Sequence, residues 1–289
     1  MGRFCASLRY RTRLIDPPFY FNFNKMRFFV KFSILVFCAV CLFCGGCIAS
    51  NNSSVKSKPI NYKVKVVETV PHLRNAYTQG LFFHNNELYE STGQYGGSSF
   101  RKVNLKDGKV LRNLAFDAKY FVEGSCVIDG RLYILTWQEN KCFVYDINSW
   151  KYLGELYNPR EGWGLTTNGK DLILSDGSEY IYFLDPMNFA QRRKIKVSYN
   201  GAAVNFINEL ELIKGEIWAN VYSTDEIVII DPETGNVTGL VDCRNLLPNS
   251  LRYSNTDVLN GIAYDEVNDA IYLTGKYWPK MYRVELVIK

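Results

Sequence analysis

The chain has 289 residues and a formal net charge of +5, and aromatic residues make up 15% of it. Arg and Lys exceed Asp and Glu mainly in the first 60 residues, so the remainder lacks the basic surface of a nucleic-acid-binding protein. The whole chain has 2 His, which argues against a His-based zinc site, and we expect no metal and no other cofactor.

The first 47 residues have the pattern of an export signal. Basic residues precede a nearly continuous apolar stretch from Phe32 to Cys47. This stretch has about 16 residues, whereas a membrane-spanning helix needs about 20. Met26 could start such a signal, in which case residues 1–25 are an upstream extension that is not part of the protein.

Cys47 follows Gly45 and Gly46, as in a bacterial lipobox, where the Cys becomes the lipidated N-terminus; Cys44 stands where Leu is usual. The alternative is an ordinary cleaved signal without lipid. Either form predicts export to the periplasm or cell envelope, and the lipidated form would be attached to the membrane. Residues 48–60 are polar and are expected to form a flexible tether to a domain at 61–289.

Five similar segments follow one another after about residue 60. Each contains several short strands separated by turn signals such as Lys106-Asp107-Gly108. A period of roughly 40–50 residues built from short strands is typical of propeller blades. We therefore predict an all-β fold, a five-bladed β-propeller, whose last blade is completed by a strand at 62–70.

One repeat carries a charge where the others are apolar. The third position of the second strand is occupied by Glu90, Ile134, Leu174, Ala219 and Leu273. A carboxylate removed from water costs several kcal/mol unless it is paired or protonated. Glu90 is therefore a candidate functional residue; the alternative is a structural ion pair with a Lys such as Lys276.

Polar side chains recur at the start of the first strand of the repeats. This column consists of Gln79, Glu123, Trp163, Asn208 and Asn260. In a propeller these positions would surround the central channel near one mouth. The polar groups could bond one another and trapped water, or they could bind a small amide or ammonium group, and the sequence leaves both open.

The second strands end in bulky or charged residues that should reach the same face. Trp137 and Lys276 occupy this position in two repeats, and Trp163 and Trp278 are expected nearby. Aromatic side chains beside a carboxylate and a Lys suggest the wall of a pocket. Elsewhere, Cys126 and Cys142 lie in one repeat and could form a disulfide or remain buried thiols.

Six short motifs follow one another along the repeats. They are Tyr77-Thr78-Gln79-Gly80-Leu81, Tyr89-Glu90-Ser91-Thr92-Gly93-Gln94-Tyr95-Gly96, Glu161-Gly162-Trp163-Gly164-Leu165-Thr166, Ile207-Asn208-Glu209-Leu210-Glu211, Leu259-Asn260-Gly261-Ile262-Ala263 and Thr274-Gly275-Lys276-Tyr277-Trp278-Pro279. In this order they resemble the plant- and bacterial-type glutaminyl-peptide cyclotransferases, over residues from about 65 to 289.

The resemblance implies a metal-independent enzyme that converts the N-terminal glutaminyl residue of peptides or proteins to pyroglutamate and releases ammonia. It assigns the family's acid/base Glu to Glu90 and a second catalytic group to Lys276. On this assignment, Glu90→Gln would abolish cyclisation and leave the fold intact. Substrate-binding residues are expected to be Gln79, Trp137, Trp163, Asn208, Asn260 and Trp278, and Lys276, Gln79, Asn260 or an indole N–H could stabilise the oxyanion.

The alternative function is a non-catalytic propeller of the cell envelope that binds a peptide or protein partner at the channel mouth. A metal-dependent lactonase-like propeller fits less well, because such propellers usually have six blades.

Overall fold

The computed structural model describes residues 58–289, which form 22 strands and one short 3-10 helix, η1 (Asn249–Leu251). The fold is all-β, as predicted. The expected signal segment with Cys47 and most of the expected tether lie outside the described residues. Within residues 58–289, no helix is long and apolar enough to cross a membrane.

Three separate four-stranded antiparallel sheets follow one another along the chain. The first contains β2 (Thr78–His84), β3 (Glu87–Thr92), β4 (Ser99–Val103) and β5 (Val110–Ala115). The second contains β6 (Val122–Ile128), β7 (Arg131–Thr136), β8 (Lys141–Asp146) and β9 (Tyr152–Tyr157). The third contains β10 (Leu165–Thr167), β11 (Leu172–Ser175), β12 (Tyr180–Leu184) and β13 (Gln191–Lys196). A short hairpin, β14 (Ser198–Tyr199) and β15 (Ala202–Ala203), comes next.

Two further antiparallel groups are joined into one eight-stranded sheet. One group contains β16 (Ile207–Ile213), β17 (Glu216–Val221), β18 (Glu226–Ile230) and β19 (Val237–Asp242). The other contains β20 (Leu259–Asp265), β21 (Ala270–Gly275), β22 (Lys280–Ile288) and β1 (Ile60–Pro71). β1 runs antiparallel to β22 and pairs in parallel with β19 over Ile60–Lys63. The earliest strand of the described chain thus completes the last group.

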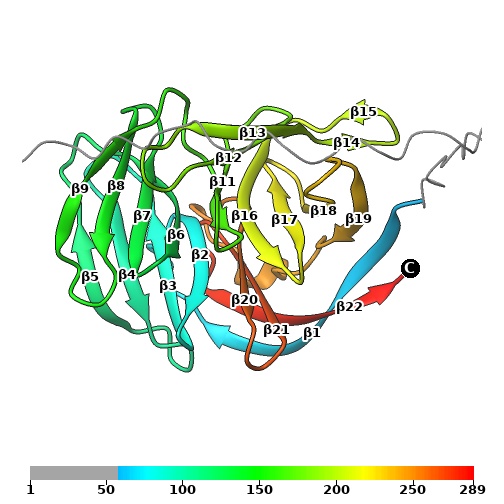
Figure 1. The fold of residues 1–289 in the computed structure, drawn as a ribbon. Coiled ribbons are helices and arrows are strands. Elements are labelled where there is room, and N and C mark those ends of the chain that lie inside the picture. The colour runs from blue at the N-terminus through cyan, green and yellow to red at the C-terminus, as the bar shows by residue number, and fades with distance from the viewer. Residues whose placement is uncertain (1–57) are drawn as a thin grey trace, which may run out of the picture. The chain divides into compact units, whose positions relative to one another are not determined.

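The first strand of each group faces a common centre. β2 contacts β6 and β20, β10 contacts β6 and β16, and β16 contacts β20, so the five first strands form a closed cycle. In Figure 1, β2, β16 and β20 lie toward the middle of the ribbon, whereas β5, β9 and β13 lie at its edges.

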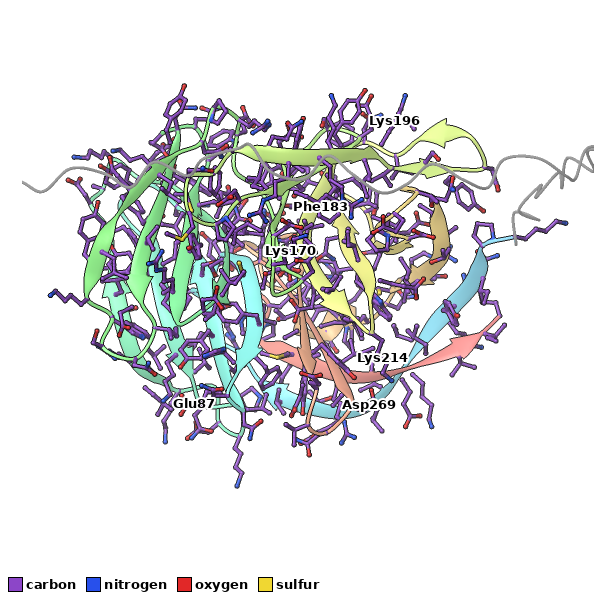
Figure 2. The ribbon with its side chains drawn as sticks, in the orientation of Figure 1. Glu87, Lys170, Phe183, Lys196, Lys214 and Asp269 are labelled. Carbon is purple, nitrogen blue, oxygen red and sulfur yellow. The ribbon has the colours of Figure 1, made fainter. Side chains whose placement is uncertain are left out.

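The apolar core lies between successive groups. Five clusters of buried residues each combine side chains from two neighbouring groups; one, for example, joins Tyr133 and Leu135 of β7 to Leu174 of β11. Cys126 and Cys142 belong to this cluster, and both are free buried thiols, which decides between the two alternatives left by the sequence. By contrast, charged residues on outer turns are exposed: Lys214 and Asp269, which approach to 2.7 Å, are visible in Figure 2.

The first strands approach one another so closely that backbone meets backbone. A Cβ atom added to Gly164 would lie 2.1 Å from the carbonyl oxygen of Asn208 in β16. One added to Gly124 in β6 would lie 2.5 Å from the backbone N of Leu165. Glycine is therefore required at these two positions by the spacing of the strands.

We expect Gly164→Ala to destabilise the protein by about 1–3 kcal/mol, because the new methyl group cannot fit without moving β10 away from β16. The exposed Gly97 is a matched control, since a Cβ atom there would meet its nearest neighbour at 3.5 Å. Urea unfolding followed by circular dichroism measures both variants. Equal stability of Gly164→Ala and Gly97→Ala would contradict the close approach.

Candidate active site

A pocket of about 250 Å³ opens where the first strands begin and the second strands end. It is lined by Tyr77, Gln79, Phe121, Glu123, Trp137, Trp163, Asn208, Tyr222 and Lys276. Five of these were predicted as site residues from the sequence: Gln79, Trp137, Trp163, Asn208 and Lys276. Their catalytic and binding roles stay predictions, but the structure brings the five side chains together.

Strand pairing explains why these residues meet. In an antiparallel pair, the start of one strand lies beside the end of the other, and Val122 of β6 indeed pairs with Thr136 of β7. Glu123 and Trp137 follow these two residues. The pairing also shifts register at Gln79, at Glu123-Gly124, at Asn208-Glu209 and at Asn260-Gly261. Such a β-bulge turns a side chain out of the regular alternation, which places polar groups at the axis.

Glu123 is a buried carboxyl with one open oxygen. Its side chain is 5% exposed, and its Oε1 accepts a hydrogen bond of 2.9 Å from Nε2 of Gln79. Its Oε2 is buried and has no hydrogen-bond partner among residues 58–289. Burial raises the pKa of Glu123 well above its usual range, and the attraction of Lys276 only partly opposes this. A buried carboxyl with a raised pKa and an open oxygen is a candidate for proton exchange with a ligand.

Lys276 is the cationic residue of the pocket and is also buried. Its Nζ lies 4.6 Å from the ring centre of Tyr77 and 5.1 Å from that of Tyr222. Burial lowers the pKa of Lys276, while the carboxylates of Glu123 and Asp257 act in the opposite direction. The faces of the two aromatic rings and the two carboxylates favour the ammonium form and oppose the effect of burial.

Asn260 and Trp278 were predicted to bind substrate, but neither lines the pocket. Nδ2 of Asn260 donates to the carbonyl oxygen of Thr78 at 2.9 Å and to Oε1 of Gln79 at 3.3 Å, so Asn260 supports Gln79 from behind. Nε1 of Trp278 donates to the carbonyl oxygen of Asp257 at 2.9 Å. Both donors are thus paired with backbone carbonyl oxygens, and a sequence pattern does not reveal this pairing.

An indole N–H was one of the donors that could stabilise the oxyanion, and in this structure the indole N–H groups of Trp137, Trp163 and Trp278 are bound elsewhere. The indole nitrogens of Trp137 and Trp163 both donate to the Glu161 carboxylate, and that of Trp278 is bound to Asp257. An indole has only one donor, so these rings can offer only their faces and edges to a ligand.

Glu90 lies elsewhere than predicted. It is 1% exposed and is not among the residues that line the pocket. Its Oε1 accepts hydrogen bonds from Oγ1 of Thr78 at 2.7 Å and from Nε2 of His72 at 2.8 Å. The prediction that Glu90 stands among aromatic walls near Lys276 is therefore wrong, because the third column of the second strand points into the protein, where His72 meets it.

His72 connects Glu90 to the turn that follows Lys276. Its Nδ1 donates to the carbonyl oxygen of Trp278 at 2.7 Å, and its backbone N–H donates to the carbonyl oxygen of Pro279 at 3.0 Å. Burial alone would lower the pKa of His72, but Glu90 raises it above the ordinary value. Burial alone would raise the pKa of Glu90, but His72 and Arg101 hold it below the ordinary value. The two groups form a buried ion pair.

Four residues of the pocket were not predicted as site residues: Tyr77, Phe121, Glu123 and Tyr222. Glu123 belonged to the polar column at the starts of the first strands, for which the sequence left a structural and a binding role open. Tyr222 occupies the same strand-end column as Trp137 and Lys276, so this column carried a usable signal. Phe121 and Tyr77 precede the aligned columns, and nothing in the repeat singled them out.

The opposite ends of the first strands surround a second cavity of about 420 Å³. It contains none of the predicted site residues. Burial raises the pKa of its carboxyl Glu211 to about 8, and this side chain is hydrogen-bonded by Thr166 and the backbone of Tyr264. In the described part of the chain, no three His, Cys, Asp or Glu side chains are grouped so that they could hold a metal ion.

Comparison with known proteins gives consistent results. A family model described as glutamine cyclotransferase matches residues 38–286. A glutaminyl-peptide cyclotransferase from Arabidopsis thaliana is 40% identical over 241 residues, which are 81% of this chain and 75% of the plant protein. The crystal structure of Myxococcus xanthus glutaminyl cyclase matches with a TM-score of 0.75 at 32% identity, covering 80% of this chain and 100% of that chain.

Because Glu90 is paired with His72, we expect Glu90→Gln to reduce stability by about 3–5 kcal/mol, since it leaves His72 buried without its counter-charge. The stability due to the raised pKa of His72 is present below its ordinary value of 6.5 and is lost as the pH rises through the folded value. The stability due to the lowered pKa of Glu90 is present above its ordinary value of 4.5 and is lost as the pH falls through the folded value.

The wild-type advantage over Glu90→Gln should therefore be largest between pH 4.5 and 6.5 and shrink on both sides. Urea unfolding at a series of pH values measures it. A constant difference at all pH values would rule out the ion pair as its source.

Proposed function

The chain belongs to the glutamine cyclotransferase family, and we propose that the pocket around Glu123 is the active site with which it acts as a glutaminyl-peptide cyclotransferase. The observation that carries this proposal is the unpaired, buried Oε2 of Glu123, which lies in a pocket with Lys276 and aromatic walls. The substrates are peptides or proteins with an N-terminal Gln.

The reaction transfers an acyl group within one residue. The α-amine of the substrate attacks the δ-carbon of its own side-chain amide, the bond to the amide nitrogen breaks, and ammonia leaves as the five-membered lactam forms. Ring closure needs the flexible side chain folded back on itself. Rigid aromatic walls such as Trp137, Trp163 and Phe121 can hold it in that conformation, which lowers the entropic part of the barrier.

Glu123 acts as the acid/base residue in this proposal. Its ionised Oε2 accepts a proton from the attacking α-amine, and the resulting carboxyl gives the proton to the departing nitrogen, so no net proton is gained or lost. The elevated pKa of Glu123 suits both steps. Gln79 holds the other oxygen, Oε1, and thereby orients the carboxyl.

Lys276 stabilises the negative charge that develops on the amide oxygen. A buried ammonium group is effective here because little water is present to screen it. Asn208 lines the same pocket and can bond the amide or the peptide backbone of the substrate. In this assignment the role first predicted for Glu90 passes to Glu123. Gln79, first predicted to bind substrate, orients Glu123 instead, and the roles predicted for Lys276 and Asn208 are retained.

We also infer that the fold is a five-bladed propeller. The closed cycle of five first strands supports this, as do the five apolar clusters, each shared by two neighbouring groups. The parallel pairing of β1 with β19 joins two blades at their outer edges and accounts for the eight-stranded sheet.

Replacing Glu123 by Gln should lower kcat for a Gln-initiated peptide by about 100- to 10,000-fold, the usual contribution of general acid–base catalysis. Ammonia release and the mass loss of the peptide are the measurements. Glu139→Gln is a matched control, because Glu139 also lies near Glu123 but does not line the pocket. Full turnover by Glu123→Gln would reject this active site, and a wild-type protein without turnover would favour the non-catalytic alternative.

Residues 26–60 support a further proposal about location. We propose that the protein is exported to the cell envelope and is lipidated at Cys47. Expressed from its full sequence in a bacterium, it should sediment with the membranes, and Cys47→Ala should move it to the soluble fraction. Wild-type protein found only in the soluble fraction would support the cleaved form without lipid.

A further inference from the structure

We propose that Glu161 is a positioning residue, which fixes two indole walls of the pocket and thereby sets the affinity for the glutaminyl substrate. This inference rests on the proposed function of the pocket. Glu161 itself does not line the pocket, so it would act through Trp137 and Trp163, which do.

One carboxylate oxygen serves both rings. Oε2 of Glu161 accepts a hydrogen bond from Nε1 of Trp137 at 2.9 Å and another from Nε1 of Trp163 at 3.0 Å. Trp137 follows β7, whereas Trp163 lies in the segment between β9 and β10. The two indoles therefore come from different sheets, and Glu161 links them at the mouth of the channel.

Further bonds keep the carboxylate in place. Its Oε1 accepts from Nε2 of Gln138 at 2.9 Å, and the backbone N–H of Gly162 donates to the carbonyl oxygen of Trp137 at 2.9 Å. Burial alone would raise the pKa of Glu161, but the three side-chain hydrogen bonds lower it. The carboxylate thus stays ionised, and hydrogen bonds to an ionised acceptor are stronger than those between neutral groups.

Each of the two linked indoles also packs against a second aromatic ring of the pocket. The ring of Trp137 lies edge-on to Phe121 with ring centres 5.6 Å apart, and the ring of Trp163 lies edge-on to Tyr222 at the same distance. All four side chains line the pocket. Glu161 therefore joins two aromatic pairs into one preformed wall, and binding to a preformed wall avoids the cost of ordering it.

A rival explanation is that Glu161 acts only through its charge. Both Glu139 and Glu161 raise the pKa of Glu123 through their negative charge. Oε1 of Glu139, however, accepts from the hydroxyl of Tyr95 and not from an indole. Glu139→Gln therefore removes a comparable charge and leaves the indole hydrogen bonds in place.

The test is the affinity for a Gln-initiated peptide in a Glu123→Gln background, followed by the quenching of tryptophan fluorescence. We expect Glu161→Gln to raise Kd about 10-fold or more, because a neutral amide oxygen is a weaker acceptor for the two indoles than a carboxylate oxygen, and the new NH2 group would face the NH2 group of Gln138. Glu139→Gln should change Kd less than about 2-fold. An unchanged Kd in Glu161→Gln, or an equal rise in both variants, would overturn the proposal.

A double-mutant cycle sharpens the result. In a protein that also carries Trp137→Phe and Trp163→Phe, the indole donors are absent, and Glu161→Gln should have little further effect on Kd, which is measured there by titration calorimetry because both pocket tryptophans are missing. A full effect of Glu161→Gln in that background would overturn the positioning role. Melting temperatures accompany every variant; if Glu161→Gln is poorly folded, Glu161→Asp replaces it, and a wild-type Kd for Glu161→Asp would equally count against the proposal.

Turnover is measured separately with Glu123 intact. There Glu161→Gln should raise KM more than it lowers kcat. Failure of Glu123 as the acid/base residue would appear as retained activity of Glu123→Gln. The KM values of Glu161→Gln and Glu139→Gln with Glu123 intact would then still test the role of Glu161.

Discussion

The meeting of five strands around one axis is the constraint on which the rest of the structure depends. The backbones come so close that Gly124 and Gly164 leave no space for a side-chain atom. Polar groups in this crowded region must find partners within the protein: the Glu209 carboxylate accepts the backbone N–H groups of Leu81 at 3.2 Å and Ile262 at 2.9 Å, and so joins three first strands. The register shifts at the starts of these strands arise in the same place, and they aim polar side chains into the pocket.

Three buried carboxylates, Glu90, Glu209 and Glu123, show how the surroundings of a carboxylate decide whether its role is structural or chemical. Glu90 is paired with His72 through Oε1 and does not line the pocket, and both oxygens of Glu209 accept backbone N–H groups. Of these three, Glu123 alone has a fully buried oxygen without a hydrogen-bond partner, and it lines the pocket. Leaving a buried acceptor unpaired costs about 1–3 kcal/mol, which the protein tolerates where a ligand can complete the bond. Burial of a carboxylate costs free energy in every case, but its hydrogen-bond and ion-pair partners determine whether it can react with a substrate.

The repeat period made the all-β fold predictable. The columns at the starts of the first strands and at the ends of the second strands made about half of the pocket predictable. Both follow from local sequence pattern. The prediction for Glu90 failed because the alignment of the repeats indicated a buried charge but could not indicate the residue that neutralises it. His72 lies between β1 and β2, outside the aligned repeats, and reaches Glu90 only when the last group is complete. Asn260 and Trp278 were also expected at the pocket, but they do not line it, and their donors bind backbone carbonyls of distant segments. Long-range hydrogen bonds of this kind leave no periodic trace in a sequence.

The pairing of β1 with β22 has a consequence for how the molecule is made. β1 emerges early from the ribosome, yet its antiparallel partner is synthesised last. Until then β1 has an unpaired edge, and exposed edges invite pairing with other chains. Contacts between the two ends of a chain also slow folding, because a long loop must close first. Ring closure is thus a late step in biogenesis, and a chain that stalls before β22 would be prone to aggregation.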